Sequence, residues 1–473
     1  MEDFVGLVNL ALAYLQHVKF QQELIACGAL DIALTVLVNS YTRFDAHPLL
    51  DDPATAGEDE AAVLQQMRSN LNQVLSDVSA LPEFTEAVPV VSPFSSSLRR
   101  WLSSPQLQLQ VCACIMLGNL ARSDAACEEF VHTGAVHKPL IRVLTNANDP
   151  QLLHAALGFL KNLALPAKNK EAIGDAGVFD VLPRLWLLDT SHQIQFSSIS
   201  LARQLLNGTL VNVQRICKEL SEDRDSPAHM RSKLSLLMAL FERTDVEPIK
   251  VEIARLITAV CRVFNTLKDS TVEHNEQSRK RFLEMHPDIG RPLSFMVSQD
   301  KWPVLRSEGW FVFALMSRYP EGAQCIGDLM YDVPVFEPLV YLLTGKKLED
   351  YRPALLASSS PGLSSTESST IVSGLSTGSP LDLQTPESVK SDAQSEEMAK
   401  IDRQNALVLV SELLRNMGSE MAVVRKVIFE DLLRGGANTL IASKGDASDE
   451  TGPAVQAPAT PGQGPGVPQP ASY

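Results

Sequence analysis

Apolar residues recur at helical spacing along most of the chain, and the clearest run begins at residue 106. Within 106–121 the apolar side chains fall three to four positions apart, on one face of a helix: Leu109, Cys112, Ile115, Met116 and Leu120. A shorter apolar segment at 125–132, a glycine and a third segment at 136–144 follow. The pattern therefore predicts three helices in succession, joined by short turns.

The same pattern recurs with a fixed period. Asn119 and Asn162 are 43 residues apart, and so are Gly134 and Gly177. A period of about 40 residues is typical of helical solenoids, in which each repeat buries its apolar face against its neighbours. Looser copies of the pattern continue toward the C-terminus. We therefore expect an all-α, right-handed superhelical solenoid of about seven units, without a sheet.

Two stretches carry a resemblance to a known family. They read GNLARSDAACEEFVHTGAV and HAALGFLKNLALPAKNKEAIGDAGV. A long helix that closes on Asn-Leu-Ala, followed by a short helix, a glycine and a further helix, resembles the armadillo repeat. More narrowly, residues 105–348 resemble the armadillo proteins that stimulate GDP dissociation from Rho- and Rap-type small GTPases. The resemblance implies a solenoid that binds such a GTPase, promotes the loss of GDP without covalent catalysis, and recognises the basic, prenylated tail of the GTPase.

Composition divides the chain into six segments. They are degenerate N-terminal units with an acidic loop at 44–59 (1–104), the best-defined repeats (105–208), divergent repeats (209–348), a Ser/Thr/Pro-rich linker (349–397), C-terminal helices with a cap (398–440) and a Pro/Gly/Ala-rich tail (441–473). The acidic loop, the linker and the tail lack the residues that form a core, and we expect them to be disordered.

Charge and cysteine content narrow the class of partner and the compartment. The net charge is −15, and the acidic excess lies at the two ends of the chain. Because a continuous basic stripe is missing, we expect no nucleic-acid partner, whereas the acidic N-terminal end fits a basic peptide or tail. No uncharged apolar stretch is long enough to suggest integral membrane association. Seven cysteines without a CxxC pair suggest reduced packing residues in a cytoplasmic protein.

Signatures of covalent chemistry are absent from the sequence. The chain has no GxxxxGK[ST] phosphate loop, no GxSxG and no HExxH motif. The nine histidines are scattered, and His132 and His137 on either side of Gly134 are typical of a solvated turn. We therefore predict that the protein is not an enzyme and has no catalytic residue, no cofactor and no metal site.

Candidate partner-binding residues lie on the long helices of the repeats. The armadillo resemblance implies that the repeated Asn points inward and binds the main chain of a ligand, which an amide can do as donor and acceptor. The candidates are Asn119, Asn162, Asn416, Arg122, Lys161, Arg203 and Gln204. An alternative stays open for the amides, which could instead bond to their own repeats. The cationic side chains could meet acidic groups of a partner or remain solvated.

A general peptide-binding adaptor or passive scaffold without exchange activity is the alternative function. A nuclear-import carrier would carry tryptophans one turn from each Asn, where they stack on lysine side chains. In this chain the corresponding places hold Leu117-Gly118 and Leu160-Lys161, and the four tryptophans do not repeat with the Asn residues. An import role is therefore disfavoured, whereas an adaptor role stays open.

Overall fold

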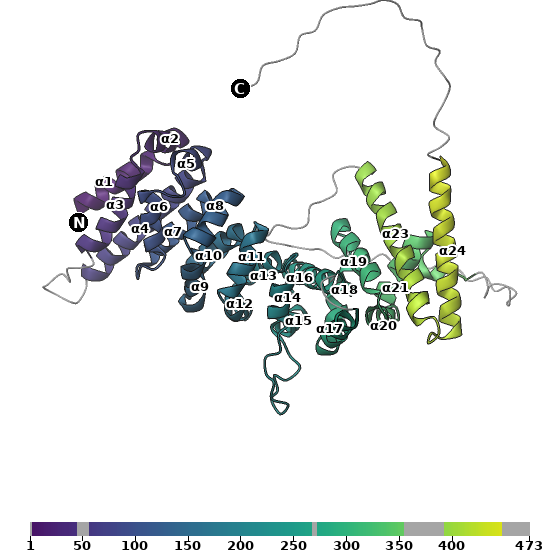
Figure 1. The fold of residues 1–473 in the computed structure, drawn as a ribbon. Helices are drawn as coiled ribbons and strands as arrows, with labels where there is room; N and C mark the ends of the chain where they lie inside the picture. The colour runs from purple at the N-terminus through teal and green to yellow at the C-terminus, as the bar shows by residue number, and fades with distance from the viewer. Residues whose placement is uncertain (1, 45–55, 267–271, 354–391, 447–473) are drawn as a thin grey trace, which may run out of the picture.

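The computed structural model of the chain describes residues 2–44, 56–266, 272–353 and 392–446 (Figure 1). Over these residues the helices follow one another in an elongated, curved row, with the two ends of the row far apart. The only extended pairing in this part of the chain consists of two isolated bridges, Glu219–Ser232 and Ser221–His229. The prediction of an all-helical solenoid is confirmed for the described residues.

The helices group into three-helix units, each of which ends on a long helix. The first four units are α2 (Val18–Ala26), α3 (Leu30–Phe44) and α4 (Ala56–Ala80); α5 (Pro82–Ala87), α6 (Pro93–Trp101) and α7 (Leu107–Leu120); α8 (Asp124–Glu128) with the π-helical turn η1 (Glu129–Thr133), α9 (His137–Asn146) and α10 (Pro150–Leu163); and α11 (Ala167–Asp175), α12 (Val178–Trp186) and α13 (His192–Leu206).

Three further units complete the row. They are α14 (Leu210–Cys217), α15 (Lys233–Arg243) and α16 (Glu247–Asn265); α17 (Val272–Met285), η2 (Pro287–Ile289) with α18 (Gly290–Val297), and α19 (Pro303–Met316); and α20 (Pro320–Leu329), α21 (Val333–Thr344) and α23 (Asp392–Met417). Helix α1 (Glu2–Tyr14) precedes the first unit, the turn η3 (Leu348–Asp350) follows α21, and α24 (Val423–Asp446) closes the row. The expectation of about seven units is therefore met within the described part of the chain.

Consecutive long helices pack against one another and form a spine. Helix α7 lies between α4 and α10, α13 lies between α10 and α16, and α19 lies between α16 and α23. One large hydrophobic core runs through all the units from Leu12 to Leu432 and is built mainly from leucine, isoleucine, valine and phenylalanine, and a small separate cluster joins Val5, Leu64 and Met67. The seven cysteines are free thiols, and Cys112, Cys114 and Cys261 are buried in this core. Repetition of one unit thus produces a continuous core.

The ends of the helices follow local rules of capping and turn geometry. Asp149 caps α10 by accepting a hydrogen bond from the Leu152 amide, and Pro150 occupies the first helical position, as the sequence indicates. Gly177 adopts a φ of 87° before α12. Its counterpart Gly134 does not adopt a positive φ, since Ala135 takes that conformation. A Cβ at 134 would lie 3.1 Å from the carbonyl oxygen of Phe130, so a side chain there would require a shift of a few tenths of an ångström.

Three segments expected to be disordered contain helical residues. In the predicted linker 349–397, helix α23 already begins at Asp392, and in the predicted tail 441–473, helix α24 continues to Asp446. In the predicted loop 44–59, Phe44 ends α3 and α4 begins at Ala56. The linker prediction was wrong at its end because residues 392–397 read DAQSEE, in which Ala, Gln and Glu are strong helix formers and Pro is absent. The rest of 44–59 and 441–473, and most of 349–397, lie outside the described residues.

Candidate partner-binding surface

The predicted site residues lie along the spine of long helices. Asn119, Lys161, Asn162, Arg203, Gln204 and Asn416 occupy the last turns of α7, α10, α13 and α23, and Arg122 follows α7 directly. Because these helices are spread along the row (Figure 1), the candidates form a series and do not meet at one point. Such a series can contact an extended segment or a broad globular face.

Each of the candidate amides donates a hydrogen bond to the preceding long helix. The pairs are Asn119 Nδ2 to Ser79 Oγ at 2.8 Å, Asn162 Nδ2 to Gly118 O at 3.0 Å, Gln204 Nε2 to Ala164 O at 3.5 Å and Asn416 Nδ2 to Ser317 O at 2.7 Å. All four acceptors belong to the last turn or the cap of that helix. Since the final carbonyls of a helix have no partner within it, Asn162, Gln204 and Asn416 satisfy groups that would otherwise be unpaired, whereas Asn119 bonds to a side-chain hydroxyl.

The same amides keep part of their hydrogen-bonding capacity. Asn119, Asn162 and Asn416 are half-buried, and none of their Oδ1 atoms accepts a hydrogen bond from another described residue. An amide nitrogen also carries two hydrogens, of which the contact to the preceding helix uses one. Each amide thus bonds to the preceding unit and not to its own repeat, as the alternative had it, and an acceptor remains on each of the three side chains.

The three cationic candidates differ in what they contact. Arg122 donates to the carbonyl oxygen of Ala80 at the end of α4, at 3.0 Å. The Nε atom of Arg203 lies 2.7 Å from Oε1 of Glu252, whose side chain is only 5% exposed. Lys161 is half-buried and forms no hydrogen bond or ion pair with the residues that the structure describes. Among these cations, Lys161 therefore has the most capacity left for a partner.

A second ion pair extends the series, and sequence reasoning missed it. The guanidinium of Arg255 on α16 donates to both carboxylate oxygens of Glu308 on α19, at 2.9 and 2.8 Å. Burial opposes the charge of Arg255, but the hydrogen bond and the attraction of Glu308 raise its pKa. The available signal was Glu252 and Arg255, which are two charges three positions apart in the otherwise apolar stretch VEIARLITAVCRVF.

A small cavity opens beside this pair, between α16, α19 and α23. Its volume is about 260 Å³, and its apolar lining includes Phe311, Met398 and Ile401. The guanidinium of Arg262 lies 5.0 Å from the centre of the Phe311 ring, which is within the range of a cation–π contact. Phe311 remains 38% exposed. The far end of the spine thus combines an apolar hollow with the charged side chains of Arg262 and Glu308.

Two titratable groups are buried close to the spine. Asp402 on α23 is 1% exposed, and burial raises the pKa of its carboxyl group although a hydrogen bond with Ser307 and the charge of Arg306 act against the shift. His286 bonds to Ser232 Oγ at 2.7 Å and to the carbonyl oxygen of Phe282 at 2.8 Å. Burial lowers the pKa of His286. These contacts join helices, and neither residue lines the cavity.

Across 2–44, 56–266, 272–353 and 392–446, no group of three or more His, Cys, Asp and Glu side chains is arranged to hold a metal ion. In those ranges, too, no single helix has the length and apolar character needed to cross a membrane. Helices α2 and α3 reach that threshold only as a pair, and the chain bends by 100° between them.

Comparison with known proteins gives two informative relatives. Over 242 residues the chain is 25% identical to the GTPase-GDP dissociation stimulator vimar of Drosophila melanogaster, across 48% of this chain and 37% of that protein. Over 155 residues it is 29% identical to Rap1 GTPase-GDP dissociation stimulator 1-A of Xenopus laevis, across 30% of this chain and 25% of that protein. The chain is similar to the GTPase-GDP dissociation stimulators. The matches span about a third of the length of these relatives or less.

Other comparisons concern family models and solved structures. No family model matches the chain. A designed armadillo repeat protein in complex with the peptide (KR)4 has a TM-score of 0.42 at 17% identity, over 55% of this chain and 95% of that one. An engineered protein has a TM-score of 0.43 at 17% identity, over 67% of this chain and 97% of the other. The resemblance to dissociation stimulators therefore comes from the sequence relatives.

Proposed function

We propose that the protein binds a small GTPase of Rho or Rap type through the spine of long helices and stimulates the dissociation of GDP. The observation that supports the proposal most is the similarity to two proteins named as GTPase-GDP dissociation stimulators. A partner that binds the nucleotide-free GTPase more tightly than the GDP-bound form shifts the equilibrium by that difference in affinity. This mechanism needs neither a catalytic residue nor a cofactor.

The contacts would come from the side chains that retain binding capacity. The free Oδ1 atoms of Asn119, Asn162 and Asn416 can accept hydrogen bonds from backbone amides of the GTPase. Lys161 can pair with an acidic side chain, and Arg122, Arg203 and Gln204 flank the same path along the spine. The apolar cavity beside Phe311 would add contact with an apolar side chain.

The proposal includes the tail of the GTPase. The first 105 residues carry a net charge of −8, which would attract a basic tail and speed its encounter with the protein. Recognition of a prenylated tail, and with it a chaperoning role in the cytoplasm, belongs to the same proposal. Exchange and chaperoning differ in what they require, since only exchange needs a preference for the nucleotide-free state.

A panel of Rho- and Rap-type GTPases loaded with a fluorescent GDP analogue tests the proposal. We expect the full chain to accelerate release of the analogue from at least one of them, in the presence of excess unlabelled GDP. Binding of the same GTPase with equal affinity in the GDP-bound and nucleotide-free forms would instead indicate an adaptor without exchange activity. A panel in which no GTPase binds at all would refute the proposal.

A further inference from the structure

The middle helices of successive units are joined by arginines. Arg184, in the last turn of α12, donates to the carbonyl oxygens of Thr145 and Ala147 at the end of α9. Arg243, in the last turn of α15, donates to the carbonyl oxygen of Trp186 at the end of α12, at 3.1 Å. Each guanidinium therefore reaches back to the unpaired carbonyls of the preceding middle helix and closes the gap between two units.

Arg142 on α9 is the counterpart of these residues one unit earlier. It lies 42 positions before Arg184 in the sequence. Unlike Arg184, it is exposed and makes no hydrogen bond or ion pair with any residue of the described chain. At the end of α6, which Arg142 would be expected to reach, the carbonyl oxygen of Leu102 instead accepts a bond from Gln110 Nε2 at 3.3 Å.

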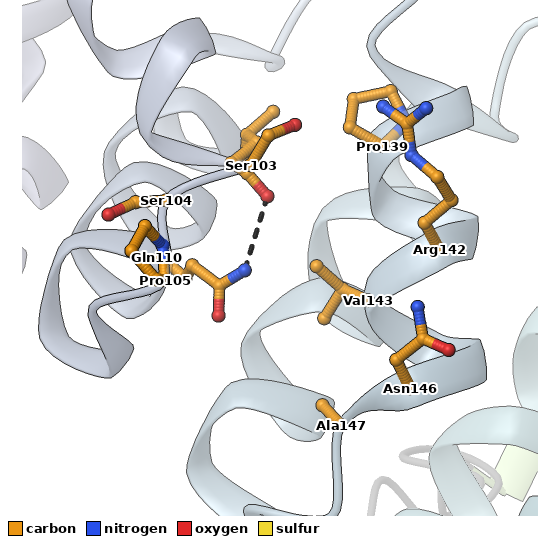
Figure 2. A pocket seen from close by; sticks show the side chains of 10 residues that line it. Ser103, Ser104, Pro105, Gln110, Pro139, Arg142, Val143, Asn146 and Ala147 are labelled. Carbon is orange, nitrogen blue, oxygen red and sulfur yellow. Dashed lines mark hydrogen bonds between the residues drawn. The ribbon is translucent and has the colours of Figure 1, made fainter.

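An open cleft takes the place of the missing contact. Its volume is about 560 Å³, and it lies between the turn that follows α6 and the face of α9. Figure 2 shows Arg142 and Asn146 on α9 across the cleft from Ser104 and Gln110. Hydroxyl, amide and guanidinium groups line the cleft together with Pro139. A volume of this size is typical of ligand-binding clefts.

The charge around the cleft is opposite to that of the chain as a whole. The chain has a net charge of −15, but α6, the turn 102–106 and α9 contain no acidic residue. The same segments carry Arg99, Arg100, Lys138 and Arg142. Of these four cations, Arg142 lines the cleft itself, and the other three lie on the flanking helices. Together they raise the local concentration of an oppositely charged ligand. The cleft is therefore suited to a negatively charged group.

We propose that this cleft binds an acidic segment of a partner polypeptide, in which a carboxylate pairs with the guanidinium of Arg142. A guanidinium presents parallel N–H donors that match the two oxygens of a carboxylate. The side-chain amides of Gln110 and Asn146 can bond to the backbone of the segment, and Pro139 offers it an apolar wall. A concave, amide-lined cleft favours a polypeptide over a flat membrane surface. This inference is independent of the proposed GTPase function.

Fluorescence anisotropy with labelled hexaglutamate tests the inference on the full chain. We expect Arg142→Gln to weaken binding by about tenfold, which is the effect of one lost charge-assisted contact. The matched control is Arg318→Gln, because Arg318 is also exposed and also makes no hydrogen bond or ion pair with the described residues. We expect this control to change the affinity by less than about twofold. Equal losses in the two variants would show diffuse attraction and overturn the proposal.

Two further measurements decide against the competing explanations. Arg142→Gln could lower the melting temperature as much as Arg184→Gln does and leave the hexaglutamate affinity unchanged. Arg142 would then bond to the preceding middle helix in solution, and the cleft would not be a binding site, which overturns the proposal. If wild-type protein binds phosphatidylserine vesicles through Arg142 but does not bind hexaglutamate, the ligand is a membrane surface and the proposal is wrong. Hexaglutamate binding that depends on Arg142, at an unchanged melting temperature, supports it.

Discussion

The amide of Asn162 offers a direct test of how the units are held together. Its Nδ2 atom donates to the carbonyl oxygen of Gly118 at 3.0 Å, in the last turn of α7. Gly118 is buried, so Asn162→Ala leaves a carbonyl without a partner in a place that water reaches poorly. A net hydrogen bond contributes about 1 kcal/mol, and a buried group left unsatisfied adds a similar penalty. We therefore expect a loss of about 1–2 kcal/mol in the free energy of unfolding.

Asn119→Ala is the matched control at the equivalent position of the preceding unit. Asn119 donates to the hydroxyl of Ser79, which itself donates to the carbonyl oxygen of Ser76 at 2.9 Å. Removal of the amide therefore leaves Ser79 with one hydrogen bond. We expect the loss of stability to fall below that range, at about 0.5 kcal/mol. The two substitutions delete the same chemical group. The difference between their losses in free energy of unfolding therefore reports whether the acceptor is left without a partner.

Equilibrium unfolding in urea, followed by circular dichroism, measures both losses. Solenoids can unfold in parts, so amide exchange at the junction of α7 and α10 is needed to locate the effect. The affinity per folded molecule is then measured with a GTPase from the panel. Unchanged unfolding together with a lower affinity for Asn162→Ala would refute the structural reasoning. It would also support the alternative that the amide mainly binds the partner. The double variant Asn119→Ala/Asn162→Ala tests this alternative for both positions at once, by the same measurements of stability and affinity.

Three other predictions concern charge. Burial raises the pKa of the Asp402 carboxyl group. The stability that the protonated form provides is therefore full in acid and is lost as the pH rises through the folded-state pKa. Asp402→Asn should match the wild-type melting temperature below about pH 4 and exceed it at pH 7. Glu308→Gln should lower the free energy of unfolding measured in urea by about 1 kcal/mol, because Arg255 loses a partly exposed ion pair. An unchanged free energy of unfolding would contradict this. Neutralising the carboxylates within 51–59 should slow association with a basic GTPase tail more than it speeds dissociation, and should reduce the salt dependence in stopped-flow traces; an unchanged rate and salt slope would exclude the loop from recognition.

Local patterns allowed the helices and their order to be predicted from the sequence. The expected helix at 106–121 is found at Leu107–Leu120, because the spacing of apolar side chains directly reports which face is buried. The start of α10 at Asp149-Pro150 is encoded just as locally, because an N-cap and a proline act within one turn. The start of α23 at Asp392 was missed because the composition of the whole linker outweighed its last helix-forming residues.

Contacts between units could not be predicted in the same way. The bond from Asn162 to Gly118 joins residues 44 positions apart, and its existence depends on how far one unit rotates relative to the next. A repeat period gives the spacing of equivalent residues but not that rotation. The arginines show the same limit. Arg142 and Arg184 are equivalent in sequence, but only Arg184 bonds to the preceding middle helix, whereas Arg142 lines a cleft. Function in a solenoid is therefore encoded partly in small departures from the repeat.

The seven candidate residues can be ranked by the contacts that each side chain already makes within the described chain. Arg203 is paired with a carboxylate that is almost fully buried, so a partner that draws Arg203 away would leave Glu252 as an unpaired buried charge. Such a separation costs several kcal/mol, which a new surface contact does not offset. Lys161 has no such commitment within the described chain, and an acidic group can approach it without breaking an existing pair. We therefore expect Lys161→Ala to lower affinity for a partner at unchanged stability, whereas Arg203→Ala lowers stability first.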